Sequence, residues 1–303
     1  MIHAVVINPR AGGGRARIRM HRLKAECPSV FRGIPWLEAE TVSEAALFLN
    51  QLPPASRVLV AGGDGTVNRL LAALMANAHQ LALMPLGSGN DLARSLGLNR
   101  LSEQQCLDIA TSQAVRSIDA GQVWFNQSQH YFVSSLCAGF DAAICQRVLL
   151  APRRLKGLGR YLYATLKALA QLEAWDIKVS AAHLVVHEGK ALFASTLNTP
   201  SYGAGMQVAP HARIDDGALD VVVAGSFSRL GALAMLPRLL TGRHIGHPQV
   251  RIHAVADLHL TTKRPIPLAA DGEYLGLTQS FEIVVRAGAL TVLAPMHATL
   301  KID

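Results

Sequence analysis

Apolar runs alternate with segments of helical spacing over the first third of the chain. Strands are expected at residues 2–7, 34–38, 58–61 and 81–84, and helices at 18–26, from 41 onward and at 67–78. The helix at 67–78 is the clearest, because Val67, Leu70, Leu71, Leu74 and Met75 recur at the spacing of one helix face. Strands that alternate with helices predict an α/β domain with a parallel sheet.

The pattern changes near Ser117, where short strand-like runs replace this alternation. The runs cover residues 118–124, 131–136, 178–187, 192–197, 220–224, 255–261 and 281–286. Such a series predicts a second, mainly antiparallel domain. Two helical segments interrupt it, at 153–169 and 230–240.

Composition narrows the class of protein. The 303 residues suffice for two domains of ordinary size, and 50% hydrophobic residues exclude a disordered chain. Lys and Arg number 29 against 21 Asp and Glu, and the resulting charge of +8 favours anionic partners such as a nucleotide or an acidic lipid surface. Only 5% of the residues are aromatic, which leaves few side chains to stack single-stranded nucleic acid. No nucleic-acid partner is therefore expected.

The cysteines and the apolar runs favour a cytoplasmic location. The four cysteines contain no Cys-x-x-Cys pair, so neither a zinc site nor a disulfide framework is predicted. The chain begins with a strand-like run rather than a secretory leader, and no uncharged apolar run reaches about 18 residues. Any membrane contact is expected to be peripheral.

Three glycine-rich turns each follow a predicted strand and precede a helix. They contain Gly12, Gly13 and Gly14, then Gly62, Gly63 and Gly65, and then Gly87 and Gly89. Free N–H groups and the positive end of the helix dipole make such a turn suitable for a phosphate, and parallel strands bring all three turns to one edge of the sheet. One such turn is also typical of an ordinary connection, but three together favour a nucleotide site. Neither G-x-G-x-x-G nor Gly-Lys-Ser/Thr is present, so dinucleotide or P-loop chemistry is not indicated.

Two polar residues near these turns, Asp64 and Thr41, are suited to a bound nucleotide. Asp64 stands at the carboxyl end of the strand at 58–61, where it can hold Mg²⁺ directly or through water. Thr41 follows the strand at 34–38 and is expected at the same edge. Ser43 is the expected N-cap of the helix that begins there.

These motifs resemble the catalytic domain of diacylglycerol and sphingosine kinases, most closely its small bacterial lipid-kinase branch. The residues that carry the resemblance are Asn8-Pro9 with Gly12-Gly13-Gly14, the run Gly62-Gly63-Asp64-Gly65-Thr66-Val67-Asn68, and the run Pro85-Leu86-Gly87-Ser88-Gly89-Asn90-Asp91-Leu92-Ala93-Arg94. Gly-Gly-Asp-Gly-Thr is shared with NAD kinases, so the last run is the part specific to lipid kinases. Ser88 stands where the family usually has Thr. Arg69 stands where it usually has Glu, and nothing explains this reversed charge.

The resemblance implies both a fold and a reaction. The fold is a three-layer α/β nucleotide-binding domain of the NAD-kinase type over 1–117, a β-sandwich-like acceptor domain over 118–286, and a tail, 287–303, that returns to the first domain. The reaction is transfer of the γ-phosphoryl group of ATP, with Mg²⁺, to a hydroxyl of a lipid such as diacylglycerol. ATP is expected to lie across the three turns, against Asn8, Gly12, Gly13, Thr41, Gly62, Gly63, Asp64, Gly65, Thr66, Asn68, Ser88, Asn90 and Asp91.

An acidic turn of the second domain matches the turn that holds a structural Mg²⁺ in this family. Carried over position by position, the ligands are the carboxylate of Asp216 and the carbonyls of Arg213 and Ala218, and Asp215 is the alternative to Asp216. Oxygen ligands of this kind are those that Mg²⁺ prefers.

The turn Asp271-Gly272-Glu273 matches the catalytic turn of the family. The resemblance makes Glu273 the proton acceptor and Asp271 a carboxylate that orients the hydroxyl or the metal. An attacking alcohol must lose its proton, and a positioned carboxylate can take it. Which of the two carboxylates is the base stays open. In the expected mechanism, Asp64 and Asp91 are direct or water-mediated partners of the Mg²⁺ on the phosphates.

The two helical segments of the second domain carry separate expectations. Segment 153–169 is basic and is expected to place Leu155, Leu158, Leu162, Leu166 and Leu169 on one face. We expect this segment to lie on an anionic bilayer or to pack on the β-sandwich of its own domain. One helix can do both at once. Segment 230–240 is expected to be core or cleft wall. His244 and His247 are expected to be loop residues rather than metal ligands.

A lipid at a membrane surface is thus the expected partner, and a homodimer is the default assembly. One alternative is an NAD-kinase-like enzyme with a soluble acceptor. Another is a catalytically silent lipid-binding regulator, against which the acidic set of Asp64, Asp91, Asp216, Asp271 and Glu273 argues. A third is a nucleic-acid binder, which only the net charge suggests. The identity of the acceptor lipid is not predicted.

Overall fold

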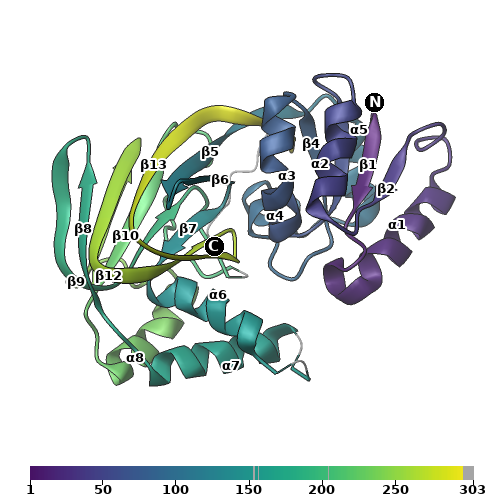
Figure 1. The fold of residues 1–303 in the computed structure, drawn as a ribbon. Coiled ribbons are helices and arrows are strands. Elements are labelled where there is room, and N and C mark those ends of the chain that lie inside the picture. Colours follow the sequence, from purple (N-terminus) through teal and green to yellow (C-terminus); the bar gives the residue numbers. More distant parts are fainter. Residues whose placement is uncertain (153, 156, 204, 296–303) are drawn as a thin grey trace. The chain divides into compact units, whose positions relative to one another are not determined.

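The computed structural model describes residues 1–152, 154–155, 157–203 and 205–295 (Figure 1). The chain forms two compact units. Unit 1 is Met1–Asp119 with the segment from Gly288 onward, and unit 2 is Ala120–Ala287. Each unit has a hydrophobic core of its own.

A parallel sheet in the order β4–β3–β1–β2 forms the centre of unit 1. Its strands are β1 (Ala4–Ile7), β2 (Trp36–Glu38), β3 (Arg57–Gly62) and β4 (Gln80–Pro85). The register places Val5 opposite Leu59, and Leu59 opposite Ala82. β1 and β3 are buried along their whole length, as their apolar runs require in a sheet that is covered on both faces.

Helices cover both faces of this sheet and give unit 1 three layers. α1 (Arg15–Glu26) and α5 (Glu103–Thr111) share one core cluster with the strands, in which Met20 and Leu107 join Leu59. The alternate strand residues point to the opposite face, where α3 (Asp64–Ala76) packs on β3 and α2 (Val42–Gln51) packs beside α3 (Figure 1).

The end of the chain adds a strand to unit 1. The last residues of β13 (Glu273–Leu293) run parallel to β4, with Thr291 opposite Gln80. Leu290, Val292 and Leu293 are buried there. Of the tail expected at 287–303, residues 296–303 lie outside the described part of the chain.

Unit 2 is mainly antiparallel. Its strands are β6 (Ser128–Phe132), β7 (Ser135–Ala138), β8 (Trp175–Ala181), β9 (Leu184–Leu197), β10 (Leu219–Gly225), β11 (Val250–Val255) and β12 (Asp257–Ala270), with parts of β5 (Val115–Phe125) and β13. The longest path runs β11–β10–β9–β7–β12–β13, and β8 pairs with both β9 and β12. The inner faces enclose a core that contains Phe132, Trp175 and Phe281, as in a β-sandwich.

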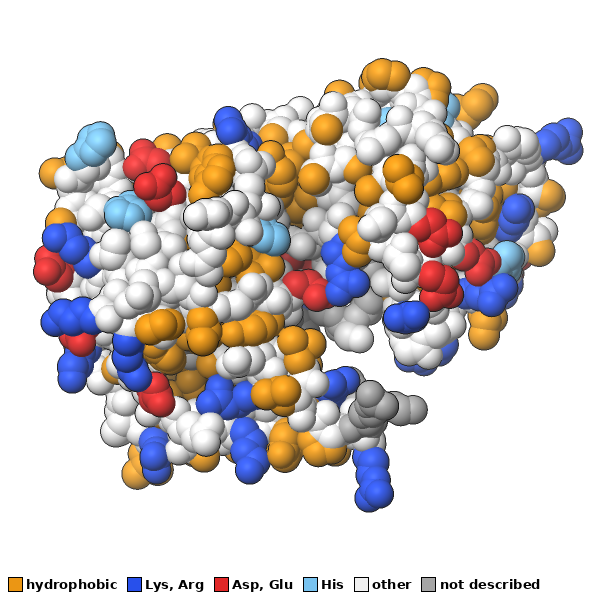
Figure 2. All heavy atoms as spheres, in the orientation of Figure 1, with side chains coloured by type: hydrophobic (Ala, Val, Ile, Leu, Met, Phe, Trp, Pro, Cys, Tyr) orange, Lys and Arg blue, Asp and Glu red, His pale blue; other side chains and the backbone are white. Residues whose placement is uncertain are grey.

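Three helices pack against the strands of unit 2. They are α6 (Phe140–Leu150), α7 (Gly157–Ala170) and α8 (Arg229–Leu240). A second core cluster joins Leu169 of α7 and Ala232 of α8 to Val222 of β10, while α6 packs on α7 and β12. Hydrophobic and basic side chains lie side by side on the outer surface of this helical layer (Figure 2).

Three local expectations differ from the structure. The single strand expected at 178–187 is two strands, because Ala182 and His183 form a turn with φ of 46° and 65°. Ala and His are not residue types typical of a left-handed turn, so this turn could not be predicted from the sequence. The helix α6 was not expected. Thr41, not Ser43, is the N-cap of α2, and its Oγ1 accepts the N–H of Glu44 at 3.2 Å.

Candidate active site

The loops that follow β1, β3 and β4 touch one another at the carboxyl edge of the sheet in unit 1. Asn8 Nδ2 donates to Thr66 Oγ1 at 2.9 Å and joins the first loop to the first turn of α3. Gly12 lies in the short helix η1 (Ala11–Gly14), where a Cβ on it would be 2.7 Å from the carbonyl oxygen of Leu86. The predicted glycine turns are therefore close together in the folded unit.

The second and third loops are in close backbone contact at two glycines. A Cβ on Gly63 would lie 2.8 Å from Gly87 Cα, and a Cβ on Gly87 would lie 2.4 Å from Gly63 Cα. Gly62 is as restricted, since a Cβ there would be 2.5 Å from Thr66 Oγ1. Close backbone approach explains why Gly63 and Gly87 are glycine, and the Thr66 side chain leaves no room for a Cβ at Gly62.

Asn90 orders the third loop from within. Its φ of 56° is left-handed, a conformation that Asn tolerates. Its Oδ1 accepts the N–H of Gly87 at 3.0 Å, and its Nδ2 donates to the Gly87 carbonyl at 2.9 Å. Ser88 is exposed at the tip of this loop. Asn90 therefore fixes the loop that presents the Ser88 hydroxyl.

The carboxylate of Asp64 caps the short helix α4 (Asp91–Ser95). Its Oδ2 accepts the N–H of Asp91 at 3.0 Å and its Oδ1 that of Leu92 at 3.0 Å. Asp91 is 5% exposed, and its Oδ1 lies 3.7 Å from Nε of Arg94. A carboxylate oxygen has a second lone pair, so the cap leaves Asp64 able to accept from water or to bind a cation. Asp64 and Asp91, both expected to act with Mg²⁺, are thus held at the start of α4.

N–H groups and guanidinium groups around the loops suit a polyanion. The first turns of α1 and α3 follow glycine loops, and the N–H groups of a first turn have no carbonyl partner within their helix. Arg15 Nε donates to the Gly12 carbonyl at 3.0 Å, and Arg94 Nη2 donates to the Gly89 carbonyl at 3.3 Å. Both guanidinium groups are therefore held beside a loop. Gly65 and Asn68 lie in the first turns of α3, and Thr41 lies after β2.

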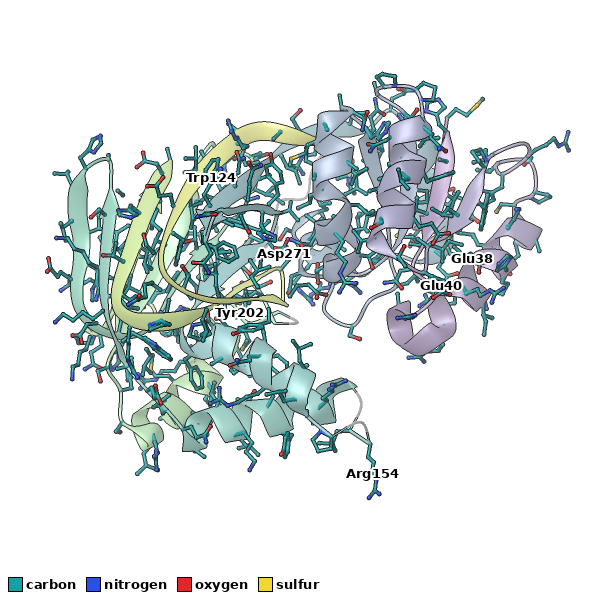
Figure 3. The ribbon with its side chains drawn as sticks, viewed as in Figure 1. Glu38, Glu40, Trp124, Arg154, Tyr202 and Asp271 are labelled. Atoms are coloured by element: carbon teal, nitrogen blue, oxygen red, sulfur yellow. The ribbon has the colours of Figure 1, made fainter. Side chains whose placement is uncertain are left out.

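In unit 2, the turn at Asp271 joins β12 to β13. Ala270 pairs with Glu273, so Asp271 and Gly272 form a two-residue loop, with φ of 45° and 84° as in a type I′ hairpin. The Asp271 carboxylate accepts three backbone N–H groups, from Val133 at 3.0 Å, Ser134 at 2.8 Å and Ser135 at 2.9 Å. Figure 3 labels Asp271 in this turn. These donors stabilise the charged carboxylate and hold it in one orientation.

Glu273 is half-buried, and its charge acts on Cys145 of α6. Burial, followed by the charges of Asp141 and Glu273, raises the pKa of the Cys145 thiol in α6 to about 12. The next residue, Tyr274, accepts a hydrogen bond at its hydroxyl from Gln146 Nε2 at 3.2 Å. α6 therefore lies directly behind the turn that carries both carboxylates.

A buried carboxylate that the sequence analysis missed also belongs to α6. Asp141 accepts hydrogen bonds from Ser195 Oγ at 2.5 Å and from the hydroxyl of Tyr202 at 2.8 Å. Burial raises the pKa of Asp141 despite these bonds, and burial followed by the charge of Asp141 raises the pKa of Tyr202 well above its usual value. No local sequence pattern marks this residue, because Ser195 and Tyr202 are 54 and 61 residues away in the chain.

The acidic turn before β10 combines three carboxylates. Asp216 is exposed, and its Oδ1 accepts the N–H of Ala218 at 3.1 Å. Asp215 lies 3.9 Å from Arg213 Nη2. Burial, followed by the charge of Asp216, raises the pKa of Asp220 to about 6. Two residues expected at the Mg²⁺ site, Asp216 and Ala218, are therefore in direct contact.

The two histidines after α8 have ordinary structural roles. His244 is buried, its Nε2 lies 2.8 Å from the Val208 carbonyl oxygen, and burial lowers its pKa. The His247 ring lies 5.1 Å from that of Phe227. Among the described residues, His, Cys, Asp and Glu side chains form no group of three or more that is placed to hold a metal ion.

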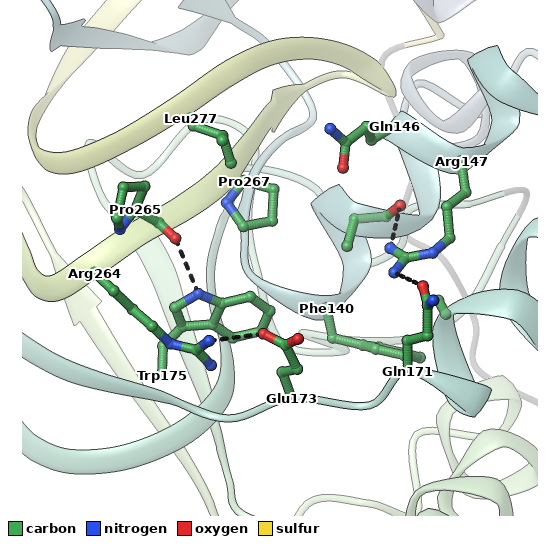
Figure 4. A pocket seen from close by; sticks show the side chains of 12 residues that line it. Phe140, Gln146, Arg147, Gln171, Glu173, Trp175, Arg264, Pro265, Pro267 and Leu277 are labelled. Carbon is green, nitrogen blue, oxygen red and sulfur yellow. Dashed lines mark hydrogen bonds and ion pairs between the residues drawn. The ribbon is translucent and has the colours of Figure 1, made fainter.

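A hollow of about 200 Å³ opens beside α6 and α7 in unit 2 (Figure 4). Phe140, Trp175, Pro265, Pro267 and Leu277 line it with apolar surface. Arg264 stacks on Trp175 at 5.2 Å and pairs with Glu173 at 2.8 Å, while Arg147 Nη2 donates to Gln171 Oε1 at 2.9 Å. The hollow therefore combines apolar side chains with polar groups, among them the guanidinium groups of Arg147 and Arg264.

Family models match nearly the whole chain. Residues 3–123 match the diacylglycerol kinase catalytic domain, and residues 134–294 match the YegS C-terminal NAD kinase beta sandwich-like domain. The chain belongs to the diacylglycerol kinase and YegS-like family of lipid kinases. Membership of this family makes the chain a kinase, and a kinase implies ATP as a substrate.

Curated relatives of this lipid-kinase family extend over most of the chain. A probable lipid kinase YegS-like of Chromohalobacter salexigens is 30% identical over 253 residues, which are 81% of this chain and 78% of that protein. A diacylglycerol kinase of Mycobacterium tuberculosis is 30% identical over 79% of this chain and 77% of its own length.

Solved structures confirm the predicted fold class. A putative diacylglycerol kinase from Bacillus anthracis superposes with a TM-score of 0.77 at 21% identity, covering 97% of both chains. An NAD kinase from Archaeoglobus fulgidus in complex with ATP superposes with a TM-score of 0.54 at 10% identity, covering 96% of this chain and 92% of that one. The lipid kinase thus has an NAD-kinase-like α/β domain followed by a β-sandwich domain. Of its described helices, none has the length and apolar character needed to cross a bilayer.

Proposed function

We propose that this protein transfers the γ-phosphoryl group of ATP to a hydroxyl group of a membrane lipid such as diacylglycerol, with Mg²⁺. The observation that carries the proposal is the contact of three glycine loops at one sheet edge, where Asp64 and Asp91 share a helix end. A lipid acceptor is supported by the names of the relatives at 30% identity.

Unit 1 supplies the groups that bind ATP. The N–H groups of the loops at Gly12, Gly63 and Gly87 offset phosphate charge, together with the guanidinium groups of Arg15 and Arg94. Asn8 and Asn90 keep the loops in place, through Thr66 and Gly87. Asp64 and Asp91 would hold Mg²⁺ directly or through water, and the ion would neutralise charge that develops on the phosphates.

Unit 2 supplies the proton acceptor. Asp271 is stabilised as an anion by three N–H donors, which makes it a weaker base and a good positioning group. We therefore assign the base to Glu273. As the lipid oxygen attacks the γ-phosphorus, its proton passes to the Glu273 carboxylate and the bond from phosphorus to the β-phosphate oxygen breaks, so that ADP leaves. A structural Mg²⁺ would be held by Asp216 with the carbonyls of Arg213 and Ala218.

The acceptor is reached at a membrane surface through a peripheral contact of α7. Leu162 and Leu166 are 56% and 55% exposed, whereas Leu169, expected on the same face, is buried. The side chain of Leu158 lies outside the described part. Leucines that face solvent on a basic helix are typical of interfacial helices.

Transfer of labelled phosphate tests the proposal and the assignment of the base. Labelled ATP and Mg²⁺ are incubated with diacylglycerol, phosphatidylglycerol, a sphingoid base or ceramide in mixed micelles, or with NAD as a soluble acceptor. We expect a labelled lipid, and about a 10²- to 10⁴-fold loss of kcat in Glu273→Gln without loss of stability. Asp271→Asn should lose both activity and thermal stability, because its amide N–H group must face at least one of the three N–H donors.

Glu282→Gln is the matched control, since Glu282 is exposed on the same strand β13 and should keep full activity. Labelled NAD without labelled lipid would replace the proposal by the soluble-acceptor alternative. Bound ATP without transfer to any acceptor would favour a silent regulator. Full activity of Glu273→Gln would remove Glu273 from the role of base.

A further inference from the structure

α8 carries apolar side chains on two opposite faces. One face packs Ala232 and Met235 inward, next to the core of β9 and β10. The other face exposes Leu230 by 79%, Leu233 by 49% and Leu240 by 61%. These leucines recur at positions i, i+3 and i+10, so they form one stripe along the helix. The expectation that 230–240 is core or cleft wall holds for the inward face alone.

α7 and the end of α6 continue this apolar surface. The cluster that buries Leu169 of α7 and Ala232 of α8 lies on the same strands, so the opposite faces of both helices point away from those strands. The exposed leucines of the three helices are Leu149, Leu150, Leu162, Leu166, Leu230, Leu233 and Leu240, here called the leucine surface. Figure 2 shows hydrophobic and basic side chains together over these helices.

The sequence around the leucine surface contains cations and no carboxylates. No Asp or Glu occurs at 142–172 or at 221–256. Arg229, Arg238 and Arg243 are exposed on or beside α8, and the described ion pairs include none with these three. Elsewhere exposed arginines do pair, as Arg10 does with Glu40. The surface is therefore complementary to an anionic one.

We propose that α8, together with α7, docks on the headgroup region of an anionic lipid bilayer. The leucines enter the boundary between headgroups and acyl chains, and the arginines contact lipid phosphates. The inference rests on the proposed function, because a lipid kinase must reach an acceptor that resides in a membrane. A second copy of the chain is the less suitable occupant, since a two-fold interface would bring the same cations opposite each other.

Vesicle sedimentation without ATP tests this surface independently of catalysis. The full chain is mixed with vesicles of phosphatidylcholine alone, or of phosphatidylcholine and phosphatidylglycerol in equal parts. We expect binding to the mixed vesicles and little to the neutral ones. The double variant Leu230→Ser with Leu233→Ser should bind the mixed vesicles about tenfold more weakly or worse. Leu184→Ser is the matched control, because Leu184 is 71% exposed on β9 and should bind as the wild type does.

Charge is tested by Arg238→Gln with Arg243→Gln. This pair should lower binding to the mixed vesicles by about twentyfold, with a smaller difference at high salt. Equal binding of the wild type to both vesicles, or unchanged binding by the leucine variant, would overturn the proposal. So would a dimer in solution that the leucine variant abolishes.

Phosphoryl transfer to a short-chain, water-soluble diacylglycerol separates this proposal from the proposed function. The leucine variant should keep wild-type transfer to that acceptor and lose transfer to diacylglycerol in vesicles. Loss of transfer by the wild type, with vesicle binding intact, would contradict the proposed function and leave the docking surface in place.

Discussion

Single atoms decide how closely the nucleotide loops approach one another. The Cα of Gly12 faces the carbonyl oxygen of Leu86, whereas Gly13 has no atom within 4 Å of the place where its Cβ would be. Both glycines have left-handed φ, at 59° and 70°. The two positions therefore share the conformational cost of a side chain and differ in its steric cost.

We expect Gly13→Ala to lower the free energy of unfolding by about 1 kcal/mol, the cost of a left-handed alanine. Gly12→Ala should cost at least about twice as much and raise the KM for ATP, because its Cβ would push the first loop away from Leu86. Urea unfolding and initial rates measure both effects. Equal results for the two variants would show that the loop contact does not matter.

Parts of the candidate site are visible in single residues and parts are not. Asp-Gly dipeptides favour type I′ hairpins, so the turn at Asp271 and Gly272 was predictable. The donors that hold Asp271 were not, because Val133 is 138 residues away in the chain. Asp141 was missed for the same reason, since Ser195 and Tyr202 reach it only in the folded unit.

Among the elements, α4 depends on another segment for its stability. A helix of five residues is too short to be stable alone. Asp64, at the start of α3, accepts the first two N–H groups of α4. The side chain thus has a structural role whether or not it also meets a cation.

Removal of this cap should open α4. We expect Asp64→Ala to lower the free energy of unfolding by about 1 to 2 kcal/mol and to speed hydrogen exchange at the amides of Asp91 and Leu92. Asp108→Ala is the control, since Asp108 is an exposed acid on α5 and should leave both amides protected. Unchanged exchange in Asp64→Ala would contradict the capping role.

The helices and strands that were predicted correctly have a clear local pattern of hydrophobic residues. The strand expected at 58–61 is β3, and the helix expected at 67–78 is α3, which begins earlier at Asp64 because Gly63 ends the strand abruptly. The sequence showed that α8 is apolar but not that it is apolar on two faces. Burial of one face depends on β9 and β10, and a helical pattern cannot show which of two stripes they cover.

At the scale of the whole molecule, the last strand of the described residues completes the first unit. Leu293 is 1% exposed and belongs to the core cluster of unit 1 with Val5 and Leu59. The same strand, β13, pairs with β12 over most of its length in unit 2. One strand thus supplies residues to both cores.

Leu293→Ala should therefore destabilise unit 1 selectively. We expect a loss of about 2 to 5 kcal/mol, the usual cost of a buried leucine, with faster hydrogen exchange in β1, β3 and β4 but not in β10 or β11. Leu277→Ala, at an exposed position of the same strand, should cost less than about 1 kcal/mol. Equal loss of protection in both units would show that they unfold together.

The position of that strand also constrains how the protein is made. A ribosome completes the segment up to β4 early, but Thr291 and Val292, which pair with β4, are synthesised after the whole of unit 2. While unit 2 is being synthesised, one edge of β4 therefore has unpaired backbone N–H and C=O groups. Such an edge can pair with a non-native strand. The sheet of the unit whose synthesis begins first is therefore completed only after unit 2 has been synthesised.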